Sequence, residues 1–168
     1  MKDILDIHDL LVEQLRELND AEQALIEALP AIESRVWSSD LREILTQYHH
    51  QVIENQMTLI QVFHNLFTLE KGERSMAIRH MIKQSYQLLE TCQTPEVSDA
   101  AIILLIQQMI HFKIASYGAV CTYAKIIGVY KDGQLLHDLL KKEKRMDSFL
   151  VSLADTDIDR KAYNYSQN

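Results

Sequence analysis

The sequence predicts an all-α protein built around a bundle of four long helices. Only four of the 168 residues are glycine and two are proline, which is too few for the many turns of an all-β fold. Apolar residues recur at three- and four-residue spacing over long stretches, as in helices that bury one face. Hydrophobic residues make up 47% of the chain and charged residues 24%, a balance typical of one folded domain with its own core.

Helix-capping signals divide the chain into five helical segments. The Ser-Ser-Asp segment at 38–40 and Thr94 followed by proline predict helix starts, whereas 71–72 and 128–133 contain glycine and predict links. Pro30 lies inside the first segment and predicts a bend or an interruption there. The predicted helices lie near residues 3–36, 39–69, 74–92, 95–127 and 132–155.

The lengths of the segments predict their arrangement. Four of them are long enough, at about 1.5 Å per residue, to run the length of a bundle. The third is shorter and lies between the second and fourth segments, which is the place of the crossover that a ferritin-like bundle needs. We predict one ferritin-like domain over residues 1–156 and a polar tail over residues 157–168, which we expect to be frayed.

The charge pattern disfavours several classes of partner. The net charge is −7 and no run of basic residues occurs, so we expect binding neither to nucleic acid nor to a membrane. The apolar run AAIILLI is too short to span a bilayer, and the first residues, MKDILDIHD, do not resemble a signal peptide, so we expect a cytoplasmic protein. Cys92 and Cys121 lack metal-ligand or redox spacing and are expected to be small buried side chains.

One polar residue interrupts the apolar face of each long helix near its middle. These residues are Glu22, Asn55, Lys113 and Glu143, with Gln56 as an alternative to Asn55. A bundle would bring the four to a common level, and Lys113 would be the cation that pairs the buried acids. In the alternative interpretation, the lysine and the glutamates extend from the apolar faces to solvent.

Four stretches carry a resemblance to a known family. They are LRELNDAEQALIEALPAI at 15–32, HHQVIENQMTLIQVF at 49–63, QQMIHFKIASYG at 107–118 and LLHDLLKKEKRMDSFL at 135–150. In order, they resemble the four long helices of the YciE/YciF-type ferritin-like family of bacterial stress-associated proteins. The likeness covers about residues 3–155. It implies a ferritin-like bundle, often dimeric, that holds two metal ions between its long helices.

The positions that the resemblance assigns to metal ligands are only half preserved. Such centres use one glutamate from each of two helices and a Glu-x-x-His pair from each of the other two. Glu22 and Glu143 match the acidic positions of the first and last helices. Val52 stands where the family has a carboxylate, and Ile110 and Lys113 replace both acids of a Glu-His-Tyr-Glu pattern. None of the seven histidines has a glutamate three residues before it, so the resemblance implies a degraded di-metal site.

A residual site for one iron or manganese ion is the alternative. Its candidate ligands are Glu22, Glu143, Asp147, His49 and His111. The ammonium of Lys113 would repel such an ion. At most one of His49 and His50 can face the core, and His111 is expected instead to pack with Tyr117.

Non-catalytic function is therefore the leading expectation. No nucleophilic triad can be placed by spacing, and the glycines do not cluster into a phosphate-binding loop. We expect a stress-associated structural or interaction protein, homodimeric and without a cofactor. A metal-binding ferroxidase or oxidase is the alternative. A third possibility is an adaptor that contacts an unknown protein through surface aromatic residues, for which the candidates are Trp37, Tyr123, Tyr130, Tyr163 and Tyr165.

Overall fold

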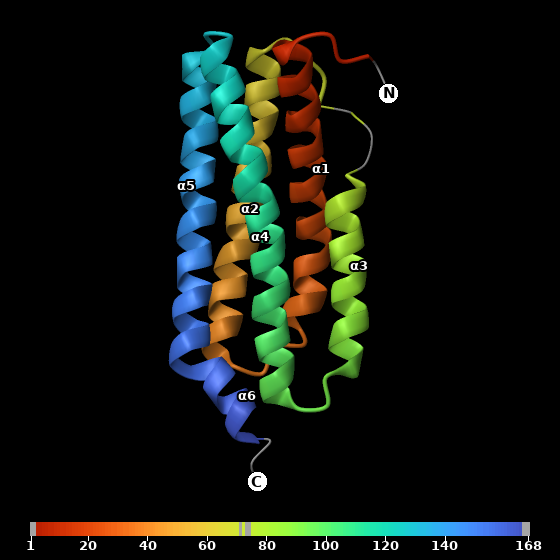
Figure 1. Ribbon diagram of the computed structural model, residues 1–168, viewed down its shortest axis with the longest axis vertical. Coiled ribbons are helices and arrows are strands. Elements are labelled where there is room, and N and C mark those ends of the chain that lie inside the picture. The colour runs from red at the N-terminus through yellow and green to blue at the C-terminus, as the bar shows by residue number, and fades with distance from the viewer. Residues whose placement is uncertain (1–2, 71, 73–74, 166–168) are drawn as a thin grey trace.

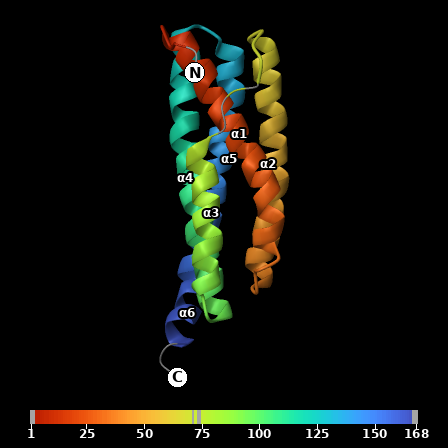
Figure 2. The ribbon, with the colours of Figure 1, turned by 90° about the vertical axis from the view of Figure 1, so that its right-hand side faces the viewer.

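Four long helices form a bundle, and a shorter one lies against its outside. The computed structural model describes residues 3–70, 72 and 75–165. The long helices are α1 (Ile7–Glu33), α2 (Ser39–Asn65), α4 (Pro95–Ile126) and α5 (Tyr130–Leu153), and the shorter one is α3 (Met76–Thr91). Figure 1 shows the four long helices side by side, and Figure 2 shows α3 along α1 and α4. The predicted all-helical bundle with a crossover helix is confirmed, and the described residues contain no strand.

Side-chain caps explain where three of the helices begin. Asp6 accepts a hydrogen bond from the backbone N–H of Asp9 at 2.8 Å, so α1 begins at Ile7 and not near residue 3. Ser38 and Thr94 cap α2 and α4 in the same way, and the starts predicted at 39 and 95 are confirmed. Each cap satisfies a backbone donor that the first turn leaves unpaired.

α2 ends earlier than predicted, at Asn65 and not at residue 69. Phe67 follows with a φ of 52°, the left-handed conformation that often terminates a helix. The N–H of Thr68 then donates to the carbonyl oxygen of Phe63 at 3.1 Å. The stop signal at 71–72 is therefore preceded by a turn built from non-glycine residues, which the sequence pattern did not reveal.

Pro30 does not interrupt α1. The helix continues past it to Glu33, and the N–H of Ser34 donates to the carbonyl oxygen of Pro30 at 3.1 Å. Because Pro30 lies in the last turn, the hydrogen bond that its missing N–H removes is close to the helix end. The predicted interruption is wrong for this reason, whereas the alternative, a bend, stays a prediction.

The segment expected to fray is helical. After Leu153 the chain passes through a π-helical turn, Ala154–Ile158, and continues as α6 (Asp159–Tyr165). Ile158 is 3% exposed and belongs to the apolar core. This anchor, together with the contact of α6 with α4, holds the segment against the end of the bundle. Residues 166–168 lie outside the described residues, and the domain boundary at residue 156 stays a prediction.

The crossover helix is attached to α1 through charged groups. Asp20 accepts a hydrogen bond from the N–H of Ser75, the residue before α3, at 2.7 Å. The guanidinium of Arg79 lies 2.8 Å from Asp20 and 3.5 Å from Glu27. The start of α3 is therefore held to the middle of α1, whereas apolar contacts with α4 cover the rest of one face.

α4 is the most apolar helix of the bundle. It is the one described helix that is long and apolar enough to cross a membrane by length and composition, with a mean hydropathy of 1.3 over its most apolar window. It packs against α1, α3 and α5, and burial on several sides accounts for this composition. The expectation that the protein does not bind a membrane stays a prediction.

Candidate functional site

A layer of polar residues divides the core into two apolar clusters. One cluster contains Leu25, Leu29, Val52, Ile110 and Leu150, and the other contains Leu15, Leu18, Leu59, Val120 and Leu136. Between them lie Glu22, Asn55, Lys113 and Glu143, all 0% exposed. Each of the four long helices supplies one of these residues from the middle of its buried face. The structure therefore places the four interrupting residues at one level, and Lys113 does not extend to solvent.

The ammonium of Lys113 lies between the two carboxylates. Its Nζ is 2.7 Å from Oε2 of Glu22 and 3.0 Å from Oε1 of Glu143. It also donates to the hydroxyl of Tyr48 at 3.3 Å. One cation on α4 thus joins α1, α2 and α5 through contacts from which water is excluded, where charge-assisted hydrogen bonds are strong.

Neutral donors supply the remaining contacts of the carboxylates. The hydroxyl of Tyr117 donates to Oε1 of Glu22 at 2.6 Å, and that of Tyr48 donates to Oε2 of Glu143 at 3.2 Å. The side-chain amides of Gln51 and Asn55 donate to Oε1 of Glu143 at 3.0 and 2.8 Å. Asn55 also lies 3.4 Å from Oε1 of Glu22. The acids are therefore solvated by protein groups from α2 and α4 in place of water.

The layer holds two acids but only one cation, and the pKa values reflect this. Burial raises the pKa of Glu22 to about 7, Lys113 opposes the rise, and Glu143 adds to it. Burial alone would lower the pKa of Lys113, but the Glu143 and Glu22 carboxylates together outweigh it and raise that pKa. Lys113 therefore stays charged, whereas the raised pKa of Glu22 brings the titration of this carboxyl into the neutral range. The interpretation that one ammonium neutralises two full negative charges is incomplete.

The two tyrosines of the layer remain hydrogen-bond donors. Burial, followed by the neighbouring carboxylates, raises the pKa of Tyr48 and of Tyr117 well above its ordinary value. Sequence reasoning treated both as apolar positions and did not include them in the layer. The spacing could have indicated that Tyr117 belongs to the layer, because Tyr117 follows Lys113 by one helical turn. Gln56, the alternative to Asn55, instead donates to Gln23 at 2.8 Å.

The other candidate metal ligands on α4 and α5 do not join the layer. Nε2 of His111 lies 3.1 Å from Oδ1 of Asp147, and the histidine side chain is 64% exposed. Gln107 donates to the same oxygen of Asp147 at 3.2 Å. The expectation that His111 packs with Tyr117 is therefore wrong, because His111 faces outward and Tyr117 is fully buried.

The remaining predicted positions lie on α2 and α4. His49 is half-buried and its ring stacks with that of the exposed His50, with centroids 6.4 Å apart. Val52 and Ile110, which stand at ligand positions in the resemblance, are both 0% exposed and belong to the same apolar cluster. Aliphatic side chains thus fill the core where the resemblance places two carboxylates.

These residues do not fit a di-metal centre. Ferritin-like centres use four carboxylates and two histidines, whereas the layer contains two carboxylates and no histidine among the described residues. The point at which its carboxylates converge is taken by Nζ of Lys113. A metal ion there would meet an ammonium group at close range.

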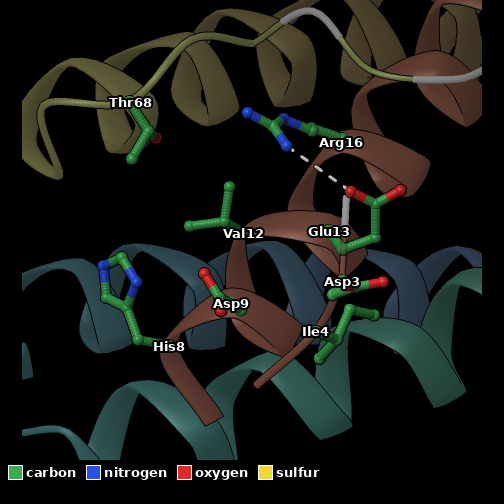
Figure 3. Close-up of a pocket in the computed structure, with 8 residues that line it drawn as sticks. All are labelled: Asp3, Ile4, His8, Asp9, Val12, Glu13, Arg16 and Thr68. Carbon is green, nitrogen blue, oxygen red and sulfur yellow. Dashed lines mark hydrogen bonds and ion pairs between the residues drawn. The ribbon is translucent and has the colours of Figure 1, made fainter. Parts of the chain in front are cut away.

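A second group of metal-binding residue types lies at the start of α1. Within the described ranges, Asp6, His8 and Asp9 are the one set of three or more whose ligand atoms lie within 4.8 Å of one another. Figure 3 shows the neighbouring hollow of about 130 Å³, in which Arg16 pairs with Glu13. Asp6 caps the helix and Asp9 accepts from the N–H of Leu5 at 3.2 Å. These carboxylates are explained by the helix start.

Both cysteines are less buried than expected. Cys92 and Cys121 are half-buried and free, so the expectation of small buried side chains is wrong. Burial raises the pKa of the Cys121 thiol, which keeps it protonated and weakly nucleophilic at neutral pH. Neither cysteine contacts the charged layer through any described hydrogen bond.

Replacing Lys113 by alanine should strongly destabilise the protein. We expect Lys113→Ala to lower the free energy of unfolding by about 3–5 kcal/mol, because it leaves two buried acids without their cation. Urea denaturation followed by circular dichroism measures the change. Lys144→Ala on the exposed side of α5 is the control and should change the free energy by less than about 0.5 kcal/mol. Equal effects of the two variants would contradict the pairing.

Glu22 should make stability depend on pH. Its pKa is raised on folding from 4.5 to about 7, so its contribution is fully present below pH 4.5 and is lost as the pH rises to 7. The loss should amount to about 3 kcal/mol. Lys113 does not titrate in this window, since its pKa is raised above 10.5.

Glu22→Gln isolates this contribution, because an amide does not titrate. Denaturation of both proteins between pH 4.5 and 8 gives the difference in their free energies of unfolding, in which the pH effects of groups that do not interact with Glu22 cancel. The stability of the unsubstituted protein relative to Glu22→Gln should fall as the pH rises. A difference that stays constant across this range would show that the pKa of Glu22 is not raised.

Known proteins share this fold over nearly the whole chain. The family model described as a domain of unknown function, DUF892, matches residues 6–163. Protein YciF of Escherichia coli strain K12 is 31% identical over 163 residues, covering 94% of this chain and 96% of that protein.

Solved structures agree. The structure of the E. coli stress protein YciF superposes with a TM-score of 0.88 at 26% identity and covers 93% of this chain and 99% of that one. YcfI of Rhodopseudomonas palustris, described as a candidate structural protein, superposes with a TM-score of 0.86 at 30% identity and covers 89% and 95%. The match along the whole chain in sequence and in structure shows that this protein belongs to the DUF892 family, the family of YciF.

Proposed function

We propose that this chain is a non-catalytic structural protein of ferritin-like type in which the ammonium of Lys113 takes the place of a metal centre. The observation that carries the proposal is the position of Nζ, 2.7 Å from Glu22 and 3.0 Å from Glu143 inside the closed core. A divalent ion and an ammonium cannot share this position, because like charges so close repel strongly in a medium of low dielectric constant.

The layer in this proposal sets the register of the four helices. Each long helix contributes one polar group, and each group finds its partners only when all four helices are at the same level. A slip of one turn would place Glu22 or Glu143 against aliphatic side chains without a cation. Such a state is costly, so the layer selects one arrangement of the bundle.

The names of the relatives support a role of this kind. The E. coli relative is called a stress protein, and the R. palustris neighbour is described as a candidate structural protein. We extend both descriptions to this chain: a stress-associated structural or interaction protein of the cytoplasm, without a cofactor. A ferroxidase or oxidase with iron or manganese would require Lys113 to leave the point between the acids.

Metal content tests the proposal directly. Protein incubated with iron(II) or manganese(II) and then desalted should carry no more metal than a buffer treated in the same way. Lys113→Glu replaces the cation by a third carboxylate and should increase retention of manganese if it folds. Lys144→Glu makes the same change of charge on the surface and is the matched control. Near-stoichiometric metal in the unsubstituted protein would overturn the proposal.

We further propose that the protein is a homodimer joined through the outward face of α2. Ile53, Met57 and Ile60 are 37%, 66% and 47% exposed and follow one another at spacings of four and three residues. A twofold axis near Met57 would place Ile53 of each copy beside Ile60 of its partner, as a self-complementary interface requires. The exposed apolar stripe formed by Ile53, Met57 and Ile60 is therefore suited to contact the same stripe of a second copy.

Sedimentation velocity tests the dimer. Met57→Glu places a charge at the centre of the stripe in both copies and should shift the protein from dimer to monomer at micromolar concentration. Met76→Glu on α3, where the side chain is similarly exposed at 67%, should leave the dimer intact. A monomeric unsubstituted protein, or a dimer insensitive to Met57→Glu, would contradict this interface.

A further inference from the structure

The link between α1 and α2 presents an exposed aromatic side chain. Trp37 is the only tryptophan of the chain and is 69% exposed. Trp37 lines a hollow together with Ile158 and Lys161, and Figure 1 shows the link between α1 and α2 at the same end of the bundle as α6, opposite the link between α4 and α5. Tryptophan is large and apolar with one polar group, so an exposed one is a strong candidate for contact with a partner.

The backbone that carries Trp37 is held rigidly. Asp99 of α4 is only 4% exposed, and its two carboxylate oxygens accept hydrogen bonds from the N–H groups of Trp37 and Ser38 at 3.0 and 2.7 Å. The guanidinium of Arg42 donates to the carbonyl oxygen of Val36. A link fixed on both sides of Trp37 presents the indole ring without a large cost in conformational entropy on binding.

Open hollows lie on both sides of the ring. The larger, of about 340 Å³, is lined by Trp37 together with Arg35, Arg42 and Ser98. The smaller, of about 170 Å³, includes Pro95 and Ile158 beside the same tryptophan. Two shallow hollows separated by an aromatic ring fit successive side chains of an extended peptide better than one enclosed small molecule.

The larger hollow is positively charged. Neither Arg35 nor Arg42 forms an ion pair with any carboxylate in the part of the chain that the structure describes. Asp99, which lines the smaller hollow together with Glu96, accepts hydrogen bonds from its two backbone donors. Two guanidinium groups that form no ion pair among the described residues, in a chain of net charge −7, form a local surface for carboxylates, which guanidinium binds in a planar, two-point geometry.

We propose that this surface, formed by Trp37, Arg35 and Arg42, docks an acidic peptide segment of a partner protein. Carboxylates of the segment pair with the two arginines, and an apolar side chain between them packs on the indole ring. The charge of the hollow selects the acidic sequence, and the rigid Trp37 supplies apolar contact area. The interaction is independent of the charged layer in the core.

Trp37 is itself the reporter for the test. The probe is a synthetic peptide of alternating glutamate and phenylalanine, and its comparison is the same peptide with lysine in place of glutamate. Excitation of tryptophan in the full-length protein should show a saturable fluorescence change with the acidic peptide, weaker at high salt. The lysine peptide should cause none. No saturable change with the acidic peptide, or an equal change with both peptides, would overturn the proposal.

Two substitutions, each of which replaces a positive side chain by a negative one, distinguish binding at this surface from an effect of net charge. The side chain of Arg35 makes no described hydrogen bond, so Arg35→Glu should fold normally and weaken acidic-peptide binding at least roughly tenfold. Lys131→Glu, at the start of α5 and the other end of the bundle (Figure 1), should leave it unchanged. An equal loss of peptide binding in both variants would show that binding depends only on net charge and would overturn the proposal.

Self-association through the same surface is the competing result. A Trp37 signal that changes with protein concentration alone, and that Arg35→Glu abolishes while the acidic peptide has no effect, would assign the surface to a second copy of this chain. That result would overturn the peptide proposal. Binding of the acidic peptide that calorimetry detects, and that Trp37→Ala abolishes, would support it.

Discussion

The arrangement of the bundle depends on the burial of two carboxylates with one ammonium. Removing such groups from water costs several kcal/mol each, and only close pairing and additional hydrogen bonds offset that cost. Glu22, Lys113 and Glu143 come from three different helices, and Asn55 and Tyr48 of the fourth bond to them. All four long helices must therefore be correctly placed before all of these groups are satisfied.

In the role that we propose for it, this layer contributes more to specificity than to net stability. Apolar side chains of similar volume would fill the same space without a desolvation penalty. The two apolar clusters on either side supply the favourable burial, whereas the layer penalises other registers. Burial raises the pKa of Glu22 to about 7 against the opposing effect of Lys113, and Glu143 adds to the rise, so the protonation of one buried acid is coupled to the packing of the bundle.

The peripheral elements depend on different contacts from the core. α3 is joined to α1 by Asp20 and Arg79, and α6 is anchored through Ile158. Asp99 holds the link between α1 and α2 and thereby fixes Trp37 at the surface. The ammonium of the core layer is bonded to both of its carboxylates, whereas the surface at the link between α1 and α2 holds an exposed aromatic ring beside two arginines that form no ion pair among the described residues.

The helical class, the order of the helices and the four polar interruptions could all be predicted from the sequence alone. Periodicity and capping are local properties, and Glu22, Asn55, Lys113 and Glu143 stand out because each breaks an apolar face. Only the tertiary structure decided which neighbours join them. Tyr48 and Tyr117 occupy positions that suit either an apolar or a hydrogen-bonding role, and His111 turns outward to Asp147. Spacing along a helix predicts only the face of the helix on which a side chain lies. A hydrogen bond between helices requires two atoms to meet within about 3 Å, and only the packing of the helices determines whether they do.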